Sequence, residues 1–285
     1  MKREHKAEMK ARARNIVLKV AYDGTAYHGF QRQTPPIVAV QNILEEKLQT
    51  IFGDTIELAA AGRTDAGVHA YGQVVNFFTD GRIPVDRIAR AANSLLPDDI
   101  VVWAAGEADT DFSARHSAKS KTYVYRIQQG EVPDPMTARY AWYIRRPLDV
   151  AAMREALAMI LGTHDFSAFR ASGGAPMSPV RTMYEATIEQ AAGQQLICRI
   201  HGSGFLYHMV RNIIGTLANV GLGVLTPARF GEILEGRDRT KASATAPASV
   251  SDRFCGTCMA MRCVMESSTT PATPISSVHH AGCST

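Results

Sequence analysis

The stretch Gly-Arg-Thr-Asp-Ala-Gly-Val-His, residues 62–69, lies between two segments with the apolar content of β-strands, residues 55–61 and 73–78. Glycine has no Cβ, so Gly62 and Gly67 allow backbone or ligand to approach the carboxylate between them. A loop held between two strands also presents its side chains from a fixed scaffold. Asp65 is therefore a candidate functional residue, although these residues alone are also consistent with an ordinary aspartate in a glycine-flanked turn.

Two neighbours of Asp65 in this stretch point to different chemistry. Arg63 is two residues away, so an extended backbone would direct both side chains the same way. Its guanidinium would favour an ionised carboxylate, which a nucleophile requires. His69 would instead pair with Asp65 in a hydrolase. No metal-ligand pattern or nucleotide-binding loop accompanies this second hypothesis, which makes it the weaker of the two.

Outward from this loop, two successive halves of the chain mix strand and helix patterns. The first half predicts strands at residues 16–22, 55–61, 73–78 and 100–105, a helix between Pro36 and Gly53, and a helix at 84–95. The second half predicts strands at residues 122–128, 139–144, 182–189 and 196–201, and helices at 148–161, 206–220 and 227–234. With no Rossmann or P-loop fingerprint, this order predicts an α+β protein with an antiparallel sheet.

Composition narrows the class of protein. The chain has 285 residues, of which 46% are apolar and 20% charged, so it can bury a core and is not disordered in bulk. The apolar run at residues 212–228 is too short and too interrupted to span a bilayer. Neither a secretory signal nor a disulfide framework is recognisable, which predicts a cytoplasmic protein.

The positive charge of the chain is unevenly placed. The net charge of +4 lies in residues 1–14, which hold six basic and two acidic residues, and the rest is balanced at 25 of each. We expect residues 1–14 to form a basic flexible arm. Residues 112–146 carry seven basic and two acidic residues, interleaved with tyrosines and a tryptophan. This pattern predicts a surface that binds the phosphates along a nucleic-acid backbone. An ordinary solvated strand pair is the alternative.

Residues 62–69, followed by Gly72-Gln73-Val74-Val75, resemble the active-site motif of the TruA family of tRNA pseudouridine synthases. Five further blocks match this family in the same order, so the resemblance covers residues 15–248 and is far more specific than a lone motif. The blocks contain Ala21-Tyr22-Asp23-Gly24-Thr25, Lys121-Thr122-Tyr123-Val124-Tyr125, His164-Asp165-Phe166, His208-Met209-Val210-Arg211-Asn212 and Ala244-Thr245-Ala246-Pro247. One departure is Phe30, where the family usually has tryptophan.

The resemblance implies the pseudouridine synthase fold: two ferredoxin-like or RRM-like α+β halves that form one extended antiparallel sheet, with flanking helices and a central cleft. On this basis we expect an N-terminal half at residues 15–111, carrying the catalytic loop, and a C-terminal half at residues 112–249. The resemblance also implies a homodimer that converts uridine to pseudouridine at positions 38, 39 and 40 in the anticodon arm of tRNA, without cofactor or metal.

Matched residue by residue, Asp65 falls on the family's catalytic nucleophile and Tyr123 on the tyrosine that packs against the target base. Arg63 and Arg211 fall on basic residues near the carboxylate, so the resemblance implies that Tyr123, Arg63 and Arg211 bind the substrate. A buried aspartate tends to take up a proton, and Arg211 would keep it ionised. From the residues alone, Arg211 could equally be a surface arginine, and Tyr123 one of several strand tyrosines.

The C-terminus departs from the family. After Ala248-Ser249 the family continues into an aliphatic strand that begins Gly-Leu, whereas here the sequence enters residues 250–285 without alternating aliphatic residues. We expect this tail to be atypical and disordered, with an unpaired sheet edge and impaired catalysis, leaving a tRNA-binding relative as the alternative function. A zinc site is a further hypothesis for this tail. It would use Cys255, Cys258, Cys263, His279 and His280.

Overall fold

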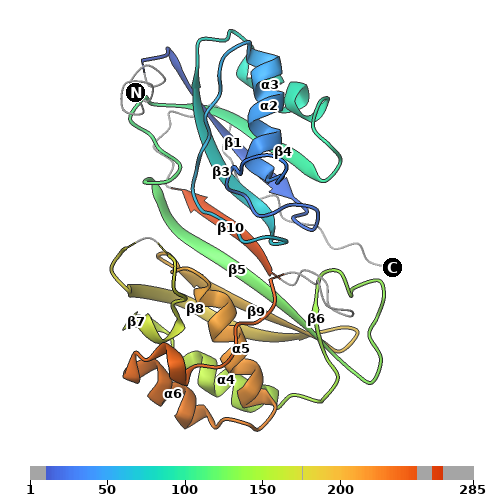
Figure 1. Cartoon of the computed structure of the whole chain (residues 1–285), viewed down its shortest axis with the longest axis vertical. Helices are drawn as coiled ribbons and strands as arrows, with labels where there is room; N and C mark the ends of the chain where they lie inside the picture. Colours follow the sequence, from blue (N-terminus) through green and yellow to red (C-terminus); the bar gives the residue numbers. More distant parts are fainter. Residues whose placement is uncertain (1–10, 175, 249–258, 266–285) are drawn as a thin grey trace.

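The computed structural model describes residues 11–174, 176–248 and 259–265, the last of these as a backbone path. The described residues form one sheet of ten strands and five α-helices (Figure 1). Among them no helix is long and apolar enough to cross a membrane. Of the predicted flexible arm, residues 1–14, the structure describes residues 11–14, where Arg14 is already the first residue of a strand. Of the predicted tail, residues 250–285, it describes residues 259–265. The rest of both segments lies outside the described part, as do four of the five residues of the zinc hypothesis.

The N-terminal half packs two helices against four strands. Its elements are β1 (Arg14–Tyr22), α2 (Val40–Phe52), β2 (Ala59–Ala60), β3 (His69–Thr79), α3 (Val85–Asn93) and β4 (Ile100–Ala108). Strand β1 pairs antiparallel with both β3 and β4. Buried aliphatic and aromatic residues of β1, β3 and α2 form one core, and α2 ends at Gly53 in the left-handed conformation that glycine adopts without strain. The order predicted for this half is therefore confirmed, except that the strand predicted at 55–61 is only two residues long.

The C-terminal half repeats this arrangement with its own core. Its elements are β5 (Ala118–Gln129), β6 (Trp142–Ile144), α4 (Val150–Ala158), β7 (Gly162–Asp165), the turn η1 (Ser167–Phe169), β8 (Val180–Ala191), β9 (Gln195–Gly202), α5 (Met209–Gly221), α6 (Pro227–Gly236) and the turn η2 (Arg239–Lys241). Helix α5 is the most buried of these, because apolar residues line it at a spacing of three and four. The sequence analysis missed β7, a four-residue edge strand that carries little hydrophobic pattern.

One more strand, β10 (Met259–Met265), connects the two halves. The sheet runs in the order β4-β1-β3-β10-β5-β9-β8-β7, and Figure 1 shows β10 between β3 and β5. It pairs parallel with β3 and antiparallel with β5, so that Met261 lies opposite both Ala70 and Tyr123. Hydrogen bonding is thereby continuous from one half to the other, and the α+β prediction of one extended sheet is confirmed.

The expectation that the chain lacks its last strand is therefore wrong. In the segment Met-Ala-Met-Arg-Cys-Val-Met, methionine and cysteine stand at the odd-numbered positions and Ala, Arg and Val at the even-numbered ones. Strands are usually recognised by aliphatic, β-branched residues, and most of the apolar residues here are methionine or cysteine instead. Its partners decide the conformation, because β3 and β5 each present an open row of backbone donors and acceptors to it. The hypothesis of an impaired tRNA-binding relative loses its structural basis.

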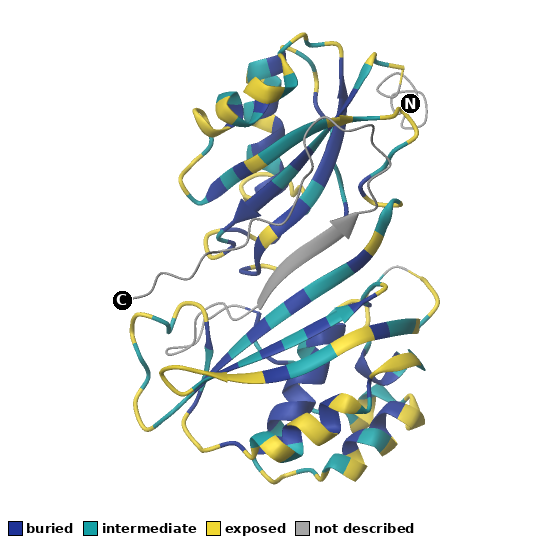
Figure 2. Cartoon of the chain, turned by 180° about the vertical axis from the view of Figure 1, so that it is seen from behind, coloured by how far each residue is buried: buried dark blue, intermediate teal, exposed yellow. Residues whose placement is uncertain are grey.

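Figure 2 shows how burial follows this architecture. Buried positions run along the strands and the inner faces of the helices, whereas the outer helix faces are exposed. The two cores are separate clusters, one in each half, and Val68 of the motif loop belongs to the cluster of the C-terminal half. The loop that carries Asp65 therefore lies where the two halves meet.

We predict that Ala260→Pro strongly destabilises the protein. Proline has no backbone N–H, and a central strand has hydrogen-bond partners on both sides, so the substitution should lower the free energy of unfolding by about 1–3 kcal/mol or more. Chemical denaturation measures this change. Ala260→Thr, which keeps the N–H and suits a strand, is the control and should change stability little. Equal stability of the two variants would contradict the position of β10 within the sheet.

Candidate active site

The loop of residues 62–69 is held against the loop that follows β1. Phe30 N–H donates to the Thr64 carbonyl oxygen at 3.1 Å, and Gly67 N–H donates to the Tyr27 carbonyl oxygen at 3.1 Å. The hydroxyls of Tyr22 and Thr64 lie 2.8 Å apart, and burial raises the pKa of Tyr22, which therefore stays neutral. These contacts fix the backbone on both sides of Asp65, so its carboxylate has a defined position.

A glycine outside the motif makes this packing possible. A Cβ on Gly24 would lie 2.1 Å from the carbonyl oxygen of Val68, a distance that no side chain tolerates. The backbone of residues 23–24 can approach the motif loop this closely because the Cβ is missing. Two loops far apart in sequence thus support each other.

Two cationic or potentially cationic groups from α5 and its N-terminus contact the same oxygen of Asp65. Arg211 Nη1 donates to Asp65 Oδ2 at 2.9 Å, and His208 Nε2 lies 3.3 Å from that oxygen. The Asp65 side chain is 25% exposed, so the pair is partly shielded from water. A charge-assisted hydrogen bond in such a place holds the two side chains together more firmly than a surface ion pair would.

Arg211 is itself held by a second contact. Residues 242–248, which we call the strap, lie along α5, and Arg211 Nε donates to the carbonyl oxygen of Ala246 at 2.8 Å. The N–H of Ala246 donates in turn to the carbonyl oxygen of Arg211 at 3.0 Å. The guanidinium therefore spans from the strap to Asp65, and both ends of it are fixed.

Asp65 and Arg211 lie in a groove of about 1360 Å³ lined by residues of both halves. Lining side chains that carry positive charge come from several separate elements: Arg32, Arg63, Arg115, Lys121, Arg170 and Arg211. A groove of this size with many guanidinium groups fits a polyanion rather than a small neutral metabolite. The site therefore has the features of a nucleic-acid interface that contains the Asp65 carboxylate.

Tyr123 lies on β5 in the wall of the same groove. Its side chain is 7% exposed, and its ring meets the edge of Phe205 at a centroid distance of 4.9 Å and an interplanar angle of 88°. An aromatic ring held edge-on by a second ring offers a fixed face against which a base can stack. Of the residues predicted from sequence, the structure thus brings Asp65, Arg211 and Tyr123 to one groove.

Arg63 and His69 are placed differently from what the motif alone suggested. Arg63 lines the groove and is exposed, but in the described part of the chain it forms no ion pair with Asp65. His69 Nδ1 lies 3.0 Å from Asp23 Oδ1, and its ring packs against Tyr140 at 5.1 Å. The pairing of Asp65 with His69, on which the hydrolase hypothesis depended, is therefore replaced by the contacts with Arg211 and His208.

Sequence reasoning did not assign His208 to the site. His208 immediately precedes α5 with φ of 55°, an uncommon backbone conformation for a residue other than glycine, and its ring stacks on Tyr207 at 3.9 Å. Burial lowers its pKa below 6.5, and the charges of Arg211 and Arg239 act in the same direction, while Asp65 opposes them. His208 is therefore less readily protonated than a free imidazole. Two signals were available in the sequence: His208 opens the block that also contains Arg211, and it stands three residues before Arg211.

The chain is similar to known proteins over most of its length. The family model described as "tRNA pseudouridine synthase" matches residues 19–127 and 156–251. The chain is 46% identical over 235 residues to the tRNA pseudouridine synthase A of Thermoanaerobacter sp. (strain X514), covering 82% of this chain and 95% of the relative. It is 43% identical to the tRNA pseudouridine synthase A of Acetivibrio thermocellus, covering 82% and 96%. The chain belongs to the tRNA pseudouridine synthase family, as its motifs indicated.

Solved structures with a partial overlay on this chain are more distant than the relatives above. A chain titled "Crystal Structure of a Cbf5-Nop10-Gar1 Complex" overlays with a TM-score of 0.33 at 12% identity, covering 86% of this chain and 48% of that chain. The family assignment stands on the family model and on the identity to the curated relatives, both of which span the motif loop, β5 and α5.

We predict that Asp65→Asn lowers the pKa of His208 further. The carboxylate is the one neighbour that stabilises the protonated ring, so its neutralisation leaves burial, Arg211 and Arg239 to disfavour the charge. The pKa of His208 falls because the charge of Asp65 raises it, and the substitution removes that charge. NMR titration of the His208 ring in both proteins measures it, and an unchanged or higher pKa in the variant would show that Asp65 and His208 are not neighbours in solution.

Proposed function

We propose that this chain isomerises uridine to pseudouridine at positions 38, 39 and 40 in the anticodon arm of tRNA. The reaction class, uridine-to-pseudouridine isomerisation in tRNA, follows from the family to which the chain belongs. The position on tRNA is our inference from the resemblance of the motif loop and the five further blocks. The observation that carries the proposal is the ion pair of Asp65 with Arg211 at the base of a cationic groove.

The geometry supports Asp65 as the nucleophile. The bond between ribose C1′ and uracil N1 must break, the base must rotate, and a bond from C1′ to C5 must form; the C5 proton leaves and N1 gains a proton, so the isomerisation is balanced. Arg211 and His208 both contact Oδ2, so we assign the attack on C1′ to Oδ1 of Asp65, which leaves C1′ again when C5 bonds there. A guanidinium on the opposite oxygen fixes the rotamer of the carboxylate without occupying the attacking atom.

The remaining groove residues support binding of an extruded nucleotide. We propose that the ring of Tyr123 packs against the target base, since base chemistry inside a stem requires the base to leave the stack. Arg63 is exposed in the groove beside Asp65, which suits a contact with a phosphate or with the displaced strand. Neither role calls for a cofactor or metal, because the isomerisation exchanges one bond to C1′ for another.

The assembly and compartment are part of the same proposal. The family resemblance supports a homodimer that grips one tRNA, acting in the cytoplasm where tRNA is processed.

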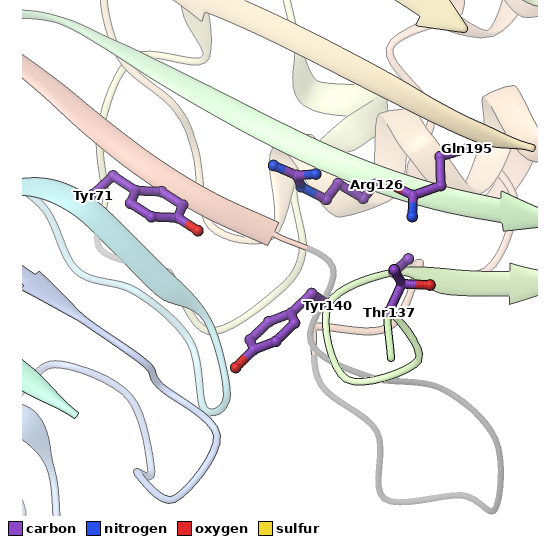
Figure 3. A pocket seen from close by; sticks show the side chains of 6 residues that line it. Tyr71, Arg126, Thr137, Tyr140 and Gln195 are labelled. Atoms are coloured by element: carbon purple, nitrogen blue, oxygen red, sulfur yellow. The ribbon is translucent and has the colours of Figure 1, made fainter. Parts of the chain in front are cut away.

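The basic segment predicted at residues 112–146 is divided between two places in the structure. Arg115 and Lys121 line the large groove, whereas Arg126 lines a separate cavity of about 200 Å³ with Tyr71, Thr137, Tyr140 and Gln195 (Figure 3). Neighbouring side chains of a strand point to opposite faces, so one strand distributes its charges to both faces of the sheet. We therefore propose that the phosphates of tRNA contact the groove-lining residues of this segment, Arg115 and Lys121, rather than all of its basic residues.

The proposed reaction is tested with tRNA transcripts labelled with tritium at C5 of uridine, since isomerisation releases that hydrogen. We expect release from a transcript with uridine at positions 38, 39 and 40, and none when all three are cytidine. Asp65→Asn should lower the rate by about 10³-fold or more, because one carboxylate does the chemistry. Its affinity for tRNA should stay within about twofold, because phosphate contacts dominate affinity.

The control for this experiment is Asp86→Asn, which removes an exposed carboxylate of α3 outside the groove. It should behave as the unmodified chain. Substantial tritium release by Asp65→Asn would remove Asp65 from the nucleophile role. Release from the cytidine-substituted transcript would leave the isomerase intact but move its target away from the three proposed positions.

We predict that tRNA affinity falls steeply with salt and that the groove residues set the slope. Arg115→Gln should reduce the slope of log K against log salt by about one, because one phosphate contact is lost. Arg146→Gln removes an exposed arginine that does not line the groove, and it should leave the slope unchanged. Filter binding at several salt concentrations measures both. Equal effects of the two variants would show that the groove is not the path of the phosphates.

A further inference from the structure

The strap, residues 242–248, is built into α5 by several hydrogen bonds. Ser243 N–H donates to Thr216 Oγ1 at 3.1 Å, and Asn219 Nδ2 donates to Ser243 Oγ at 2.8 Å. A Cβ on Gly215 would lie 2.1 Å from the carbonyl oxygen of Ala244, so the strap lies directly on the backbone of the helix. Pro247 and Ala248 at its end line the groove. The strap is therefore a wall of the site and the support of Arg211 at the same time.

One arginine outside the groove ties this strap together. Arg239 Nη1 donates to the carbonyl oxygens of Ala242 and Ser243 at 3.3 and 3.2 Å. Its Nη2 donates to Thr245 Oγ1 at 3.3 Å and to Asn212 Oδ1 at 3.1 Å. One planar guanidinium thus contacts the strap at three residues and the helix at one.

Asn212 completes the connection to the helix that carries Arg211. Its side chain is fully buried, accepts from Thr245 Oγ1 at 2.5 Å, and donates through Nδ2 to the carbonyl oxygen of Phe169 at 2.7 Å. Asn212 directly follows Arg211 in α5. The network therefore joins the strap, α5 and the turn η1 immediately behind the residue that pairs with Asp65.

We propose that Arg239 is a positioning residue for the isomerisation: by fixing the strap against α5, it holds the carbonyl oxygen of Ala246 where that oxygen orients the guanidinium of Arg211 toward Asp65. The path has three links, from Arg239 to the strap, from Ala246 to Arg211 Nε at 2.8 Å, and from Arg211 Nη1 to Asp65 at 2.9 Å. Lysine cannot replace Arg239, because an ammonium lacks the planar fork that meets several acceptors at once.

The effect should fall on the chemical step rather than on tRNA binding. Arg239 does not line the groove, so its loss removes no contact with the substrate. A displaced strap would leave Arg211 without a fixed acceptor at Nε, and a small displacement of a catalytic ion pair costs rate more than affinity. Loss of a residue that merely stabilised the fold would instead lower the melting temperature, without reducing the rate more than the affinity.

The experiment compares Arg239→Lys with Arg237→Lys in the full chain, using single-turnover tritium release and tRNA binding. We expect Arg239→Lys to lower the single-turnover rate by about tenfold or more, with the tRNA Kd within about twofold. Arg237 lies two residues away, is largely exposed and does not contact the strap through any described hydrogen bond, so Arg237→Lys should match the unmodified chain. Equal rates in the two variants, or a loss confined to Kd, would overturn the proposal.

A second pair of variants keeps the test decisive if Arg239→Lys folds poorly. Thr245→Val removes the hydroxyl that joins Arg239 to Asn212 at nearly constant volume, whereas Thr245→Ser retains it. We expect the valine variant to lose rate in the same way as Arg239→Lys and the serine variant to keep most of it. Equal rates for valine and serine would show that the network does not act on the site.

A double-mutant cycle identifies the link to Arg211. In an Arg211→Lys background the bridge from Ala246 to Asp65 is already broken, so adding Arg239→Lys should slow the rate by no more than about twofold. Additive losses would mean that Arg239 acts independently of Arg211, which contradicts the proposal. Since the inference rests on the proposed function, the unmodified chain is assayed first: its failure to isomerise tRNA would reject that function, whereas the variants test the positioning role alone.

Discussion

The ion pair between Asp65 and Arg211 is the contact on which the rest of the site depends. The two residues are 146 positions apart in sequence and come from different halves of the chain. A partly buried carboxylate needs a partner that offsets its lost hydration, and the partner must be held as firmly as the carboxylate itself. The motif loop fixes one side of the pair, and α5 with the strap fixes the other. Chemistry at this position therefore requires that the two halves keep one relative arrangement.

Continuous backbone pairing across the sheet supplies that arrangement. Strand β10 comes from the far C-terminus, yet it lies between β3 and β5 and hydrogen-bonds to both. Strand β3 begins at the last residue of the motif loop, and β5 carries Tyr123. The same strand that joins the halves thus sets the distance between the loop of Asp65 and the wall of the groove. Without a central partner, β3 and β5 would each expose an unpaired edge.

Close backbone approach is the means by which each side of the ion pair becomes rigid. Gly24 lets the loop after β1 lie on the carbonyl of Val68, and Gly215 lets the strap lie on α5. Contacts of backbone on backbone leave little freedom for the side chains they carry, which lowers the cost of holding a charge pair in one geometry. Polar residues such as Asn212 then satisfy the buried groups that such close packing creates. The positions of Asp65 and Arg211 are thus decided by residues that do not line the groove, such as Gly24, Gly215 and Asn212.

The sequence by itself determined the local elements and the identity of the chemistry. Alternating and helical periodicity placed most strands and helices, since these patterns report which face is buried, and the motif loop with its matching blocks pointed to Asp65, Tyr123 and Arg211. Only the tertiary structure decided which partners those residues have. It brought His208 rather than His69 to Asp65, left Arg63 exposed in the groove, and divided the basic segment between two faces. It also showed that Met259–Met265 is a strand. The open edges of β3 and β5 determine that conformation, whereas the composition of the segment is not typical of a strand.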